Sequence, residues 1–294
     1  MKPIDLVGKE FFLFKKYVFQ NANLQLTFLA TLIFLFFTTI TQAEQHDQSS
    51  EYELYWHQWR GPTSNGIAPR SNNPPLEWSE QQNILWKLEI PGEGHASPII
   101  WKDQIFILTC TPIEIEKKEQ PEENEDGGDT DFFGIPLEQF KQAAQTGGRN
   151  RRSEAPNLNL KLAVICVDRT TGQVEWERIV RETQPHEGTH NTATWASYSP
   201  ITDGDYLYAN FGSFGLYCLD LSGNVQWEID LGDMRTRNSF GEGSSATLYN
   251  KTLIVNWDHE GESFIVAFSK RTGEELWRQP RDEVTSWATP IIVE

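Results

Sequence analysis

The residues best equipped for chemistry in this chain form one short polar run, His186-Glu187-Gly188-Thr189-His190. Its pattern, H-E-x-x-H, supports zinc-dependent hydrolysis when both histidines lie one turn apart on the same face of a helix. Here Pro185 precedes the run, Gly188 interrupts it, and no apolar helical stripe surrounds it. We therefore expect a loop with a polar cluster rather than a zinc hydrolase. Metal binding without hydrolysis stays open, because imidazoles and carboxylates could still converge there.

Further ionisable or aromatic side chains stand beside the short apolar segments of the chain. The candidate binding residues are His95, His186, Glu187, His190, Arg235, Arg237, Asn238, Glu242, Asp258, His259, Glu260 and Trp287. Four of them carry the oxygen ligands that calcium prefers, namely Asn238, Glu242, Asp258 and Glu260. Their spacing singles none of them out, so the sequence alone assigns no catalytic residue and no metal ligand.

The segments that must position these residues repeat along the chain. Residues 163–176, 215–227 and 264–277 each run from an apolar strand through a polar turn to a tryptophan. A glycine stands four residues before the tryptophan each time, and Trp176, Trp227 and Trp277 are spaced by 51 and 50 residues. Glycine suits a hairpin position with positive φ, and an indole suits packing between sheets. Trp86 lies 90 residues before Trp176, a gap that an insertion explains, and we predict the same blade-packing role for it.

A second element precedes each of these segments. Ser97-Pro98, Ser199-Pro200 and Ser245-Ala246 each open a pair of short strands, and Thr289-Pro290 starts the same pattern again. Each unit thus holds four strands of about 4–6 residues. Four-stranded units at a period of about 40–50 residues predict an all-β fold, a β-propeller of antiparallel blades. A β-sandwich with chance spacing is the alternative.

The number of predicted blades is too small to close a propeller ring. The sequence predicts three complete blades and the start of a fourth. An open arc would expose strand edges that a closed ring removes. We therefore expect the chain to be the N-terminal fragment of a longer propeller, or a gene product that is cut short.

The strand order places the candidate binding residues on one face of the propeller. Because successive strands of a blade are antiparallel, the loops between second and third strands share a face with the connections from each fourth strand to the next blade. All of the candidate binding residues fall in these loops and connections, which we call the loop-rich face, whereas hairpin turns such as residues 169–172 lie opposite. Loops on a rigid scaffold commonly carry function, which predicts a ligand or partner site there.

The N-terminal residues 1–43 have the pattern of a secretory signal peptide. Lys15 and Lys16 precede the uncharged run 26–40, and Ala43 is a suitable residue before a cleavage site. The run is short for a membrane span, although an uncleaved anchor is the alternative. We expect a periplasmic or extracellular protein without a membrane span after cleavage, with a polar lead over 44–55 and the propeller over 56–294.

An insertion interrupts the first blade at residues 111–158. It holds an acidic run, 114–131, and a basic run, 149–152. Such a composition is typical of a solvated flexible loop. A loop that binds a partner is the alternative.

The charge of the chain limits its partners. The formal net charge is −17, and it is −19 without residues 1–43. This surface repels phosphate backbones, which excludes nucleic acid as a partner, and it argues against docking on anionic lipid. It is compatible with cations or basic partners.

The three cysteines fit the interior of the blades. Cys166 and Cys218 occupy the same slot of neighbouring repeats, and Ala267 occupies it in the third. Equivalent strands of adjacent blades rarely bring Cα atoms within the roughly 7 Å that a disulfide needs. We therefore expect small buried strand residues with free thiols.

The combined pattern S-P-x-x … D-x-x-T-G-x-x-x-W resembles the repeat of the pyrroloquinoline-quinone (PQQ)-like β-propeller family. That family includes the quinoprotein alcohol dehydrogenases and the outer-membrane assembly factor BamB. The resemblance covers roughly residues 56–294 outside the insertion. Trp59-Arg60-Gly61-Pro62 and the stretches 232–234 and 256–261 are similar to exported propeller proteins of this group.

The resemblance implies two functions. The first is a non-catalytic exported scaffold that binds a protein partner or a small ligand on its loop-rich face, without a cofactor. The alternative is a dehydrogenase that depends on PQQ and calcium, in which the ion would polarise the quinone carbonyl. Those dehydrogenases carry an adjacent cysteine pair over the cofactor, and this chain has none. We therefore favour the non-catalytic scaffold and leave the enzyme as the rival.

Overall fold

A computed structural model describes residues 51–68, 73–113 and 155–293. The chain divides into two compact units, Met1–Leu54 and Tyr55–Glu294, and the described strands all belong to the second. The predicted signal peptide, most of the polar lead and most of the insertion lie outside the described residues. Within the ranges that the structure describes, no helix is long and apolar enough to cross a membrane.

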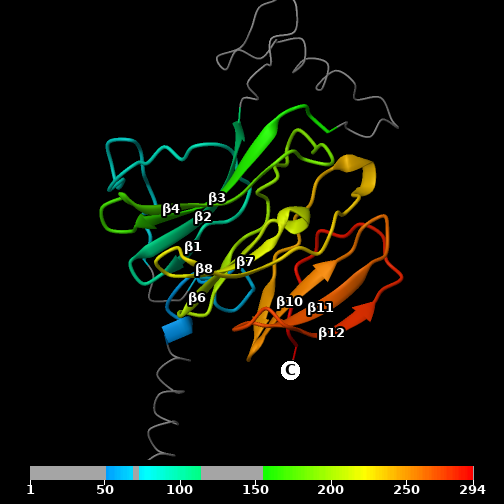
Figure 1. The fold of residues 1–294 in the computed structure, drawn as a ribbon. Coiled ribbons are helices and arrows are strands. Elements are labelled where there is room, and N and C mark those ends of the chain that lie inside the picture. The colour runs from blue at the N-terminus through cyan, green and yellow to red at the C-terminus, as the bar shows by residue number, and fades with distance from the viewer. Residues whose placement is uncertain (1–50, 69–72, 114–154, 294) are drawn as a thin grey trace, which may run out of the picture. The chain divides into compact units, whose positions relative to one another are not determined.

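The described strands form three antiparallel sheets of four strands each, and the strands of every sheet follow chain order (Figure 1). The first sheet comprises β1 (Ile99–Trp101), β2 (Gln104–Ile113), β3 (Asn159–Asp168) and β4 (Val174–Thr183). The second comprises β5 (Ile201–Thr202), β6 (Tyr206–Asn210), β7 (Leu216–Asp220) and β8 (Val225–Ile229). The third comprises β9 (Thr247–Tyr249), β10 (Thr252–Trp257), β11 (Phe264–Ser269) and β12 (Glu275–Pro280).

These sheets confirm the predicted all-β propeller of four-stranded antiparallel blades. The strands of the first blade are longer than predicted, since β2, β3 and β4 have ten residues each. The reason is that the β2–β3 ladder continues to the pair Ile113 and Asn159, at the base of the insertion. The innermost strands are shorter than predicted, with three residues in β1 and two in β5.

The middle strands of the second blade are buried on both faces, because the first and third blades cover its two sides. In β7 every residue from Leu216 to Leu219 is buried, so this strand is a continuous apolar run rather than an alternating one. The outermost strands are the opposite, and every residue of β12 is exposed. One hydrophobic cluster joins Tyr208 and Leu216 of the second blade to Leu253 and Phe268 of the third.

Tryptophans join adjacent blades through one repeated contact. The indole N–H donates to a backbone oxygen in the next blade's outer hairpin: Trp86 to Arg169 at 2.9 Å, Trp176 to Leu221 at 3.0 Å and Trp227 to Lys270 at 3.2 Å. Each ring also lies against the glycine of that hairpin, and a Cβ on Gly223 or Gly273 would lie 2.8 or 3.0 Å from its atoms. Glycine is thus required by the indole as well as by its positive φ. Trp277 has no such neighbour among the described residues and is 45% exposed.

A chain of hydrogen bonds joins the inner strands of successive blades. The N–H of Ser97 donates to Ser199 Oγ at 3.0 Å, and the N–H of Ser199 donates to Ser245 Oγ at 2.9 Å. The N–H of Ser245 then donates to Thr289 Oγ1 at 3.2 Å. The second repeated element therefore connects blades, and Thr289 occupies the position of the next unit although residues 281–293 form no strand.

The three cysteines are buried and free. Cys166 pairs with Trp176 across the β3–β4 ladder, and Cys218 pairs with Trp227 across β7–β8. This register confirms that both occupy the same slot of the repeat. Burial raises the pKa of Cys110 to about 11 and that of Cys218 to about 12, so these thiols remain protonated and unreactive at neutral pH.

Candidate functional site

The antiparallel strand order puts six described segments on the loop-rich face. They are residues 91–98, 184–200, 211–215, 230–246, 258–263 and 281–288. Two short 3-10 helices lie within them, η1 (Gly212–Phe214) and η2 (Arg237–Ser239). The hairpin turns of the blades lie on the opposite face.

The histidines of the H-E-x-x-H run do not share a helix face, because residues 184–190 form extended chain and bends. His186 Nε2 lies 2.8 Å from the Met234 carbonyl oxygen. A carbonyl only accepts, so Nε2 carries the proton of this ring. His190 Nδ1 instead lies 2.8 Å from Thr192 Oγ1, and its ring packs against Phe240 with centroids 5.2 Å apart. The two rings thus lack the geometry of a zinc hydrolase.

Glu242 is the central acidic group of this face, and its side chain is only 11% exposed. Its Oε2 accepts hydrogen bonds from the Tyr198 hydroxyl and the Ser213 N–H, both at 2.9 Å, and its Oε1 accepts one from Ser213 Oγ at 2.5 Å. A carboxylate offers about four acceptor positions. One position on Oε1 therefore remains, and His186 Nε2 lies 4.0 Å from this oxygen.

The surroundings of Glu242 explain its electrostatics. A Cβ on Gly212 would collide with the Glu242 carboxylate and the Tyr198 hydroxyl, so glycine makes the room for this contact. Burial raises the pKa of Glu242, and hydrogen bonds from Ser213 and Tyr198 oppose that rise. Burial also raises the pKa of Tyr198 well above its ordinary value, and the Glu242 charge adds to the effect. Tyr198 is therefore a permanent hydrogen-bond donor to the carboxylate.

Glu187 links two loops beside this site. Its Oε2 accepts hydrogen bonds from the N–H and the hydroxyl of Thr236, at 2.9 and 3.0 Å. Its backbone oxygen accepts the indole N–H of Trp195 at 3.1 Å. Glu187 thus fixes the position of the Trp195 ring.

Asp258 is 3% exposed, and neighbouring side chains donate three hydrogen bonds to its carboxylate. Arg281 donates to its two oxygens at 2.8 and 3.2 Å, and Asn256 Nδ2 donates at 3.0 Å. The hydrogen bond to Asp258 also raises the pKa of Arg281. Asp258 therefore holds the segment after β12 in place and is not a free ligand.

His259, Glu260 and Arg235 order the neighbouring loops. His259 Nδ1 accepts the Arg235 N–H at 3.1 Å, and its Nε2 donates to the Glu262 oxygen at 3.2 Å. The Arg235 guanidinium donates to the Glu260 backbone oxygen at 3.1 Å, and Glu260 Oε1 accepts the Thr285 hydroxyl at 2.8 Å. Both ring nitrogens of His259 are committed, so this histidine is structural.

An exposed patch surrounds η2. The Arg237 N–H donates to Thr285 Oγ1 at 2.9 Å, and the Trp287 indole donates to the Gly241 oxygen at 2.8 Å. These bonds place residues 284–287 beside residues 237–241, where Asn238 is exposed with a φ of 56°. We define the η2 patch as Arg237, Phe240, Val284 and Trp287, whose last three members are 41%, 56% and 45% exposed.

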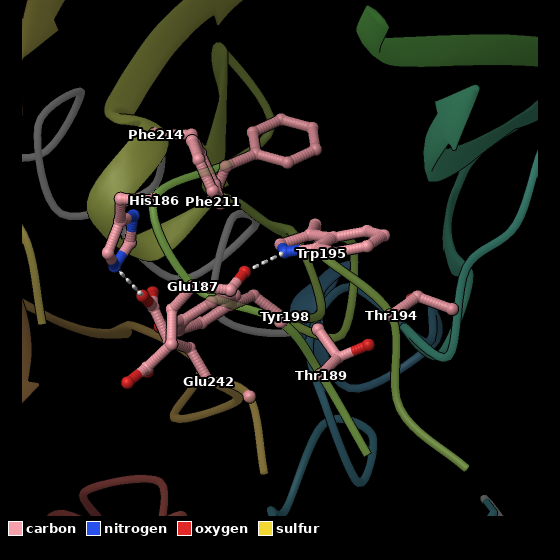
Figure 2. A pocket seen from close by; sticks show the side chains of 11 residues that line it. His186, Glu187, Thr189, Thr194, Trp195, Tyr198, Phe211, Phe214 and Glu242 are labelled. Carbon is pink, nitrogen blue, oxygen red and sulfur yellow. Dashed lines mark hydrogen bonds and ion pairs between the residues drawn. The ribbon is translucent and has the colours of Figure 1, made fainter. Parts of the chain in front are cut away.

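A small pocket lies within the loop-rich face, between the β4–β5 connection, η1 and the segment before β9. Among the candidate binding residues it brings together His186, Glu187 and Glu242. Figure 2 shows the rings of Phe211, Phe214 and Trp195 on one side of this space and Glu242 on the other. The cavity volume is about 10 Å³, roughly the room that one water molecule needs. His95 is exposed and lines no part of it.

The pocket beside Glu242 does not fit PQQ and calcium. The pocket has room for a water-sized group and not for a tricyclic quinone. Arg281 and Asn256 donate three hydrogen bonds to Asp258, and Ser213 and Tyr198 donate three to Glu242. Within the residues that the structure describes, no three His, Cys, Asp or Glu side chains come together as metal ligands.

Four aromatic residues that line the pocket were missing from the candidates drawn from the sequence: Trp195, Tyr198, Phe211 and Phe214. Ser213, which binds Glu242, was missing too. The available signal was the stretch Phe211-Gly212-Ser213-Phe214, which puts aromatic side chains beside a glycine in a loop of the predicted face. Tyr198 stands 44 residues from Glu242, and only the packing of one blade on the next brings them together.

Comparison with known proteins identifies the repeat. The family model described as outer membrane protein assembly factor BamB matches residues 159–290. Among solved structures, BamB from Moraxella catarrhalis is 15% identical with a TM-score of 0.31, and the match covers 46% of this chain and 38% of that chain. A search of the curated proteins finds no match.

Two quinohemoprotein alcohol dehydrogenases are also similar. The one from Comamonas testosteroni is 13% identical with a TM-score of 0.30, over 45% of this chain and 21% of that chain. One from Pseudomonas putida is 13% identical with a TM-score of 0.37, over 80% of this chain and 27% of that chain. The chain thus spans at most 38% of the length of these solved structures.

Proposed function

We propose that this chain is an exported propeller scaffold that binds a polypeptide partner on its loop-rich face, because residues 159–290 match the family model described as outer membrane protein assembly factor BamB. The family description, an outer membrane protein assembly factor, favours a protein as the partner over a small substrate. The signal-peptide pattern of residues 1–43 supports export to the periplasm or beyond.

The η2 patch is the observation that carries this proposal. It presents a tryptophan, a phenylalanine and an arginine together on the surface, and these residue types are enriched in protein interfaces. A hydrogen bond from the Arg237 N–H to Thr285 and one from the Trp287 indole to the Gly241 oxygen join the two segments of the patch to each other. A preordered aromatic surface loses little conformational freedom when a partner binds.

Site-specific photo-crosslinking tests the face. A benzoylphenylalanine residue replaces Arg237, in the η2 patch, or Arg271, an exposed arginine of the β11–β12 turn on the opposite face. We expect a discrete adduct, identified by mass spectrometry after irradiation of the producing cells, from position 237 and none from position 271. Equal adducts from both positions, or adducts from 271 alone, would show that the loop-rich face is not the binding face.

A second experiment tests the rival dehydrogenase. The purified chain receives PQQ with Ca²⁺, then an alcohol or a sugar together with an electron-accepting dye. We expect an unchanged PQQ spectrum and no dye reduction, because the pocket beside Glu242 is too small for the quinone. Saturable spectral change with substrate-dependent dye reduction would establish the enzyme instead.

A further inference from the structure

The pocket beside Glu242 combines two features that favour a bound cation. One is a mostly buried carboxylate whose Oε1 accepts one hydrogen bond, from Ser213, and otherwise has only the longer 4.0 Å contact with His186 Nε2. The other is a wall of aromatic rings, to which Phe214 and Trp195 contribute (Figure 2). A cation gains from both, since it pairs with the carboxylate and is attracted to the faces of aromatic rings.

The volume of the pocket and the number of ligands that it offers then determine which cation can bind. A space of about 10 Å³ admits a group no larger than water, so a guanidinium or a quaternary ammonium is too large. A metal ion would need several oxygen or nitrogen ligands, and the described residues offer no cluster of three or more. A primary ammonium is compact and carries its own three donors.

We infer that this pocket binds a primary ammonium group, which donates a hydrogen bond to Glu242 Oε1 and lies against the Trp195 and Phe214 rings. The group would be the end of a lysine side chain or the N-terminal amine of a polypeptide. This inference rests on the proposed function, since the amine would belong to the partner. The net charge of −17 would favour the approach of such a basic segment.

Titration of the purified, ¹⁵N-labelled chain with n-butylammonium chloride tests the site. The signal is the indole N–H resonance of Trp195, assigned by its loss in Trp195→Phe, at about pH 8, where alkylammonium groups remain charged. We expect a saturable shift with a dissociation constant of about 1 mM. Sodium chloride at equal ionic strength and tetramethylammonium chloride are expected to give no saturable shift.

Two variants separate the charge from the rings. Glu242→Gln keeps the size of the side chain, and we expect it to weaken n-butylammonium binding at least about tenfold, as loss of a charge-assisted bond does. Phe214→Leu keeps the carboxylate and is expected to weaken binding about threefold through the lost ring. The other indole resonances report whether each variant stays folded.

The probes also distinguish the two sources of the amine. N-acetyl-lysine amide presents a side-chain ammonium, and glycine amide presents a chain terminus; stronger binding of either assigns the source. The inference is overturned if n-butylammonium gives no more shift than sodium chloride, which would leave a water site. It is also overturned if Glu242→Gln responds equally or tetramethylammonium binds as well. Crosslinking at position 237 remains unaffected by either result, so it tests the proposed function separately.

Discussion

Trp227→Ala is expected to lower the free energy of unfolding by about 4 kcal/mol, as truncation of a packed aromatic side chain does. The indole of Trp227 lies against Gly273 and donates to the Lys270 oxygen, so its loss removes contacts between the second and third blades. Urea unfolding followed by circular dichroism measures the change. The melting temperature should fall by about 10 °C for a domain of this size.

Trp277→Ala is the matched control, because Trp277 occupies the same slot of the next repeat. Trp227 pairs with Cys218 across its ladder, and Trp277 pairs with Ala267 across the equivalent one. Trp277 is 45% exposed and meets no following hairpin among the described residues. Its replacement in the 294-residue chain should change stability by no more than about 0.5 kcal/mol. Equal losses in both variants would show that the indole acts within its own blade.

Gly223→Ala tests the same kind of contact from the side of the glycine, here the contact between Gly223 and Trp176. Gly223 has a φ of +84°, and an added Cβ would lie 2.8 Å from the ring of Trp176. Gly232 has a similar φ of +90° with nothing within 4 Å of an added Cβ. Gly232→Ala should therefore lose only the roughly 1 kcal/mol of left-handed strain, and Gly223→Ala about 2 kcal/mol more through overpacking. Similar losses of stability in the two variants would show that Gly223 is needed only for its positive φ and not for its contact with Trp176.

The repeat explains how much of this fold was predictable. A residue whose role recurs in every blade, such as Trp176 or Trp227, is visible from spacing because the same contact is made several times. The glycine four residues before each of these tryptophans is visible from spacing for the same reason. The length of β2 was not predictable, since its ladder continues into a segment that has no counterpart in the other blades.

The site was less predictable than the scaffold. The sequence places Glu242 and Asp258 alike, as acidic residues of one face. Their difference depends on partners far along the chain, because Asp258 is paired with the Arg281 guanidinium whereas Glu242 accepts hydrogen bonds from the neutral groups of Ser213 and Tyr198. Such partners are set by the register of loops from two blades, which a repeat pattern does not specify.

Glu242→Ala is expected to destabilise the protein by about 4 kcal/mol, because it leaves three donors without an acceptor. They are the Tyr198 hydroxyl, the Ser213 N–H and the Ser213 hydroxyl. An unsatisfied buried polar group costs about 1–3 kcal/mol, and water entering the vacated space would reduce the total. Urea unfolding at neutral pH measures the effect, and a loss below about 1 kcal/mol would contradict the network.

Glu242→Gln is the matched variant, and its comparison with the native chain over pH isolates the charge. Burial raises the folded-state pKa of Glu242, so the folded chain holds this proton more tightly than the unfolded chain does. The resulting stabilisation is present below the unfolded pKa, about 4.3 for glutamate, and is lost as pH rises through the folded pKa. Stability of the native chain relative to Glu242→Gln should therefore fall as pH rises through this window. A rise instead would mean that the hydrogen bonds outweigh burial, and that Glu242 is held as a stabilised carboxylate.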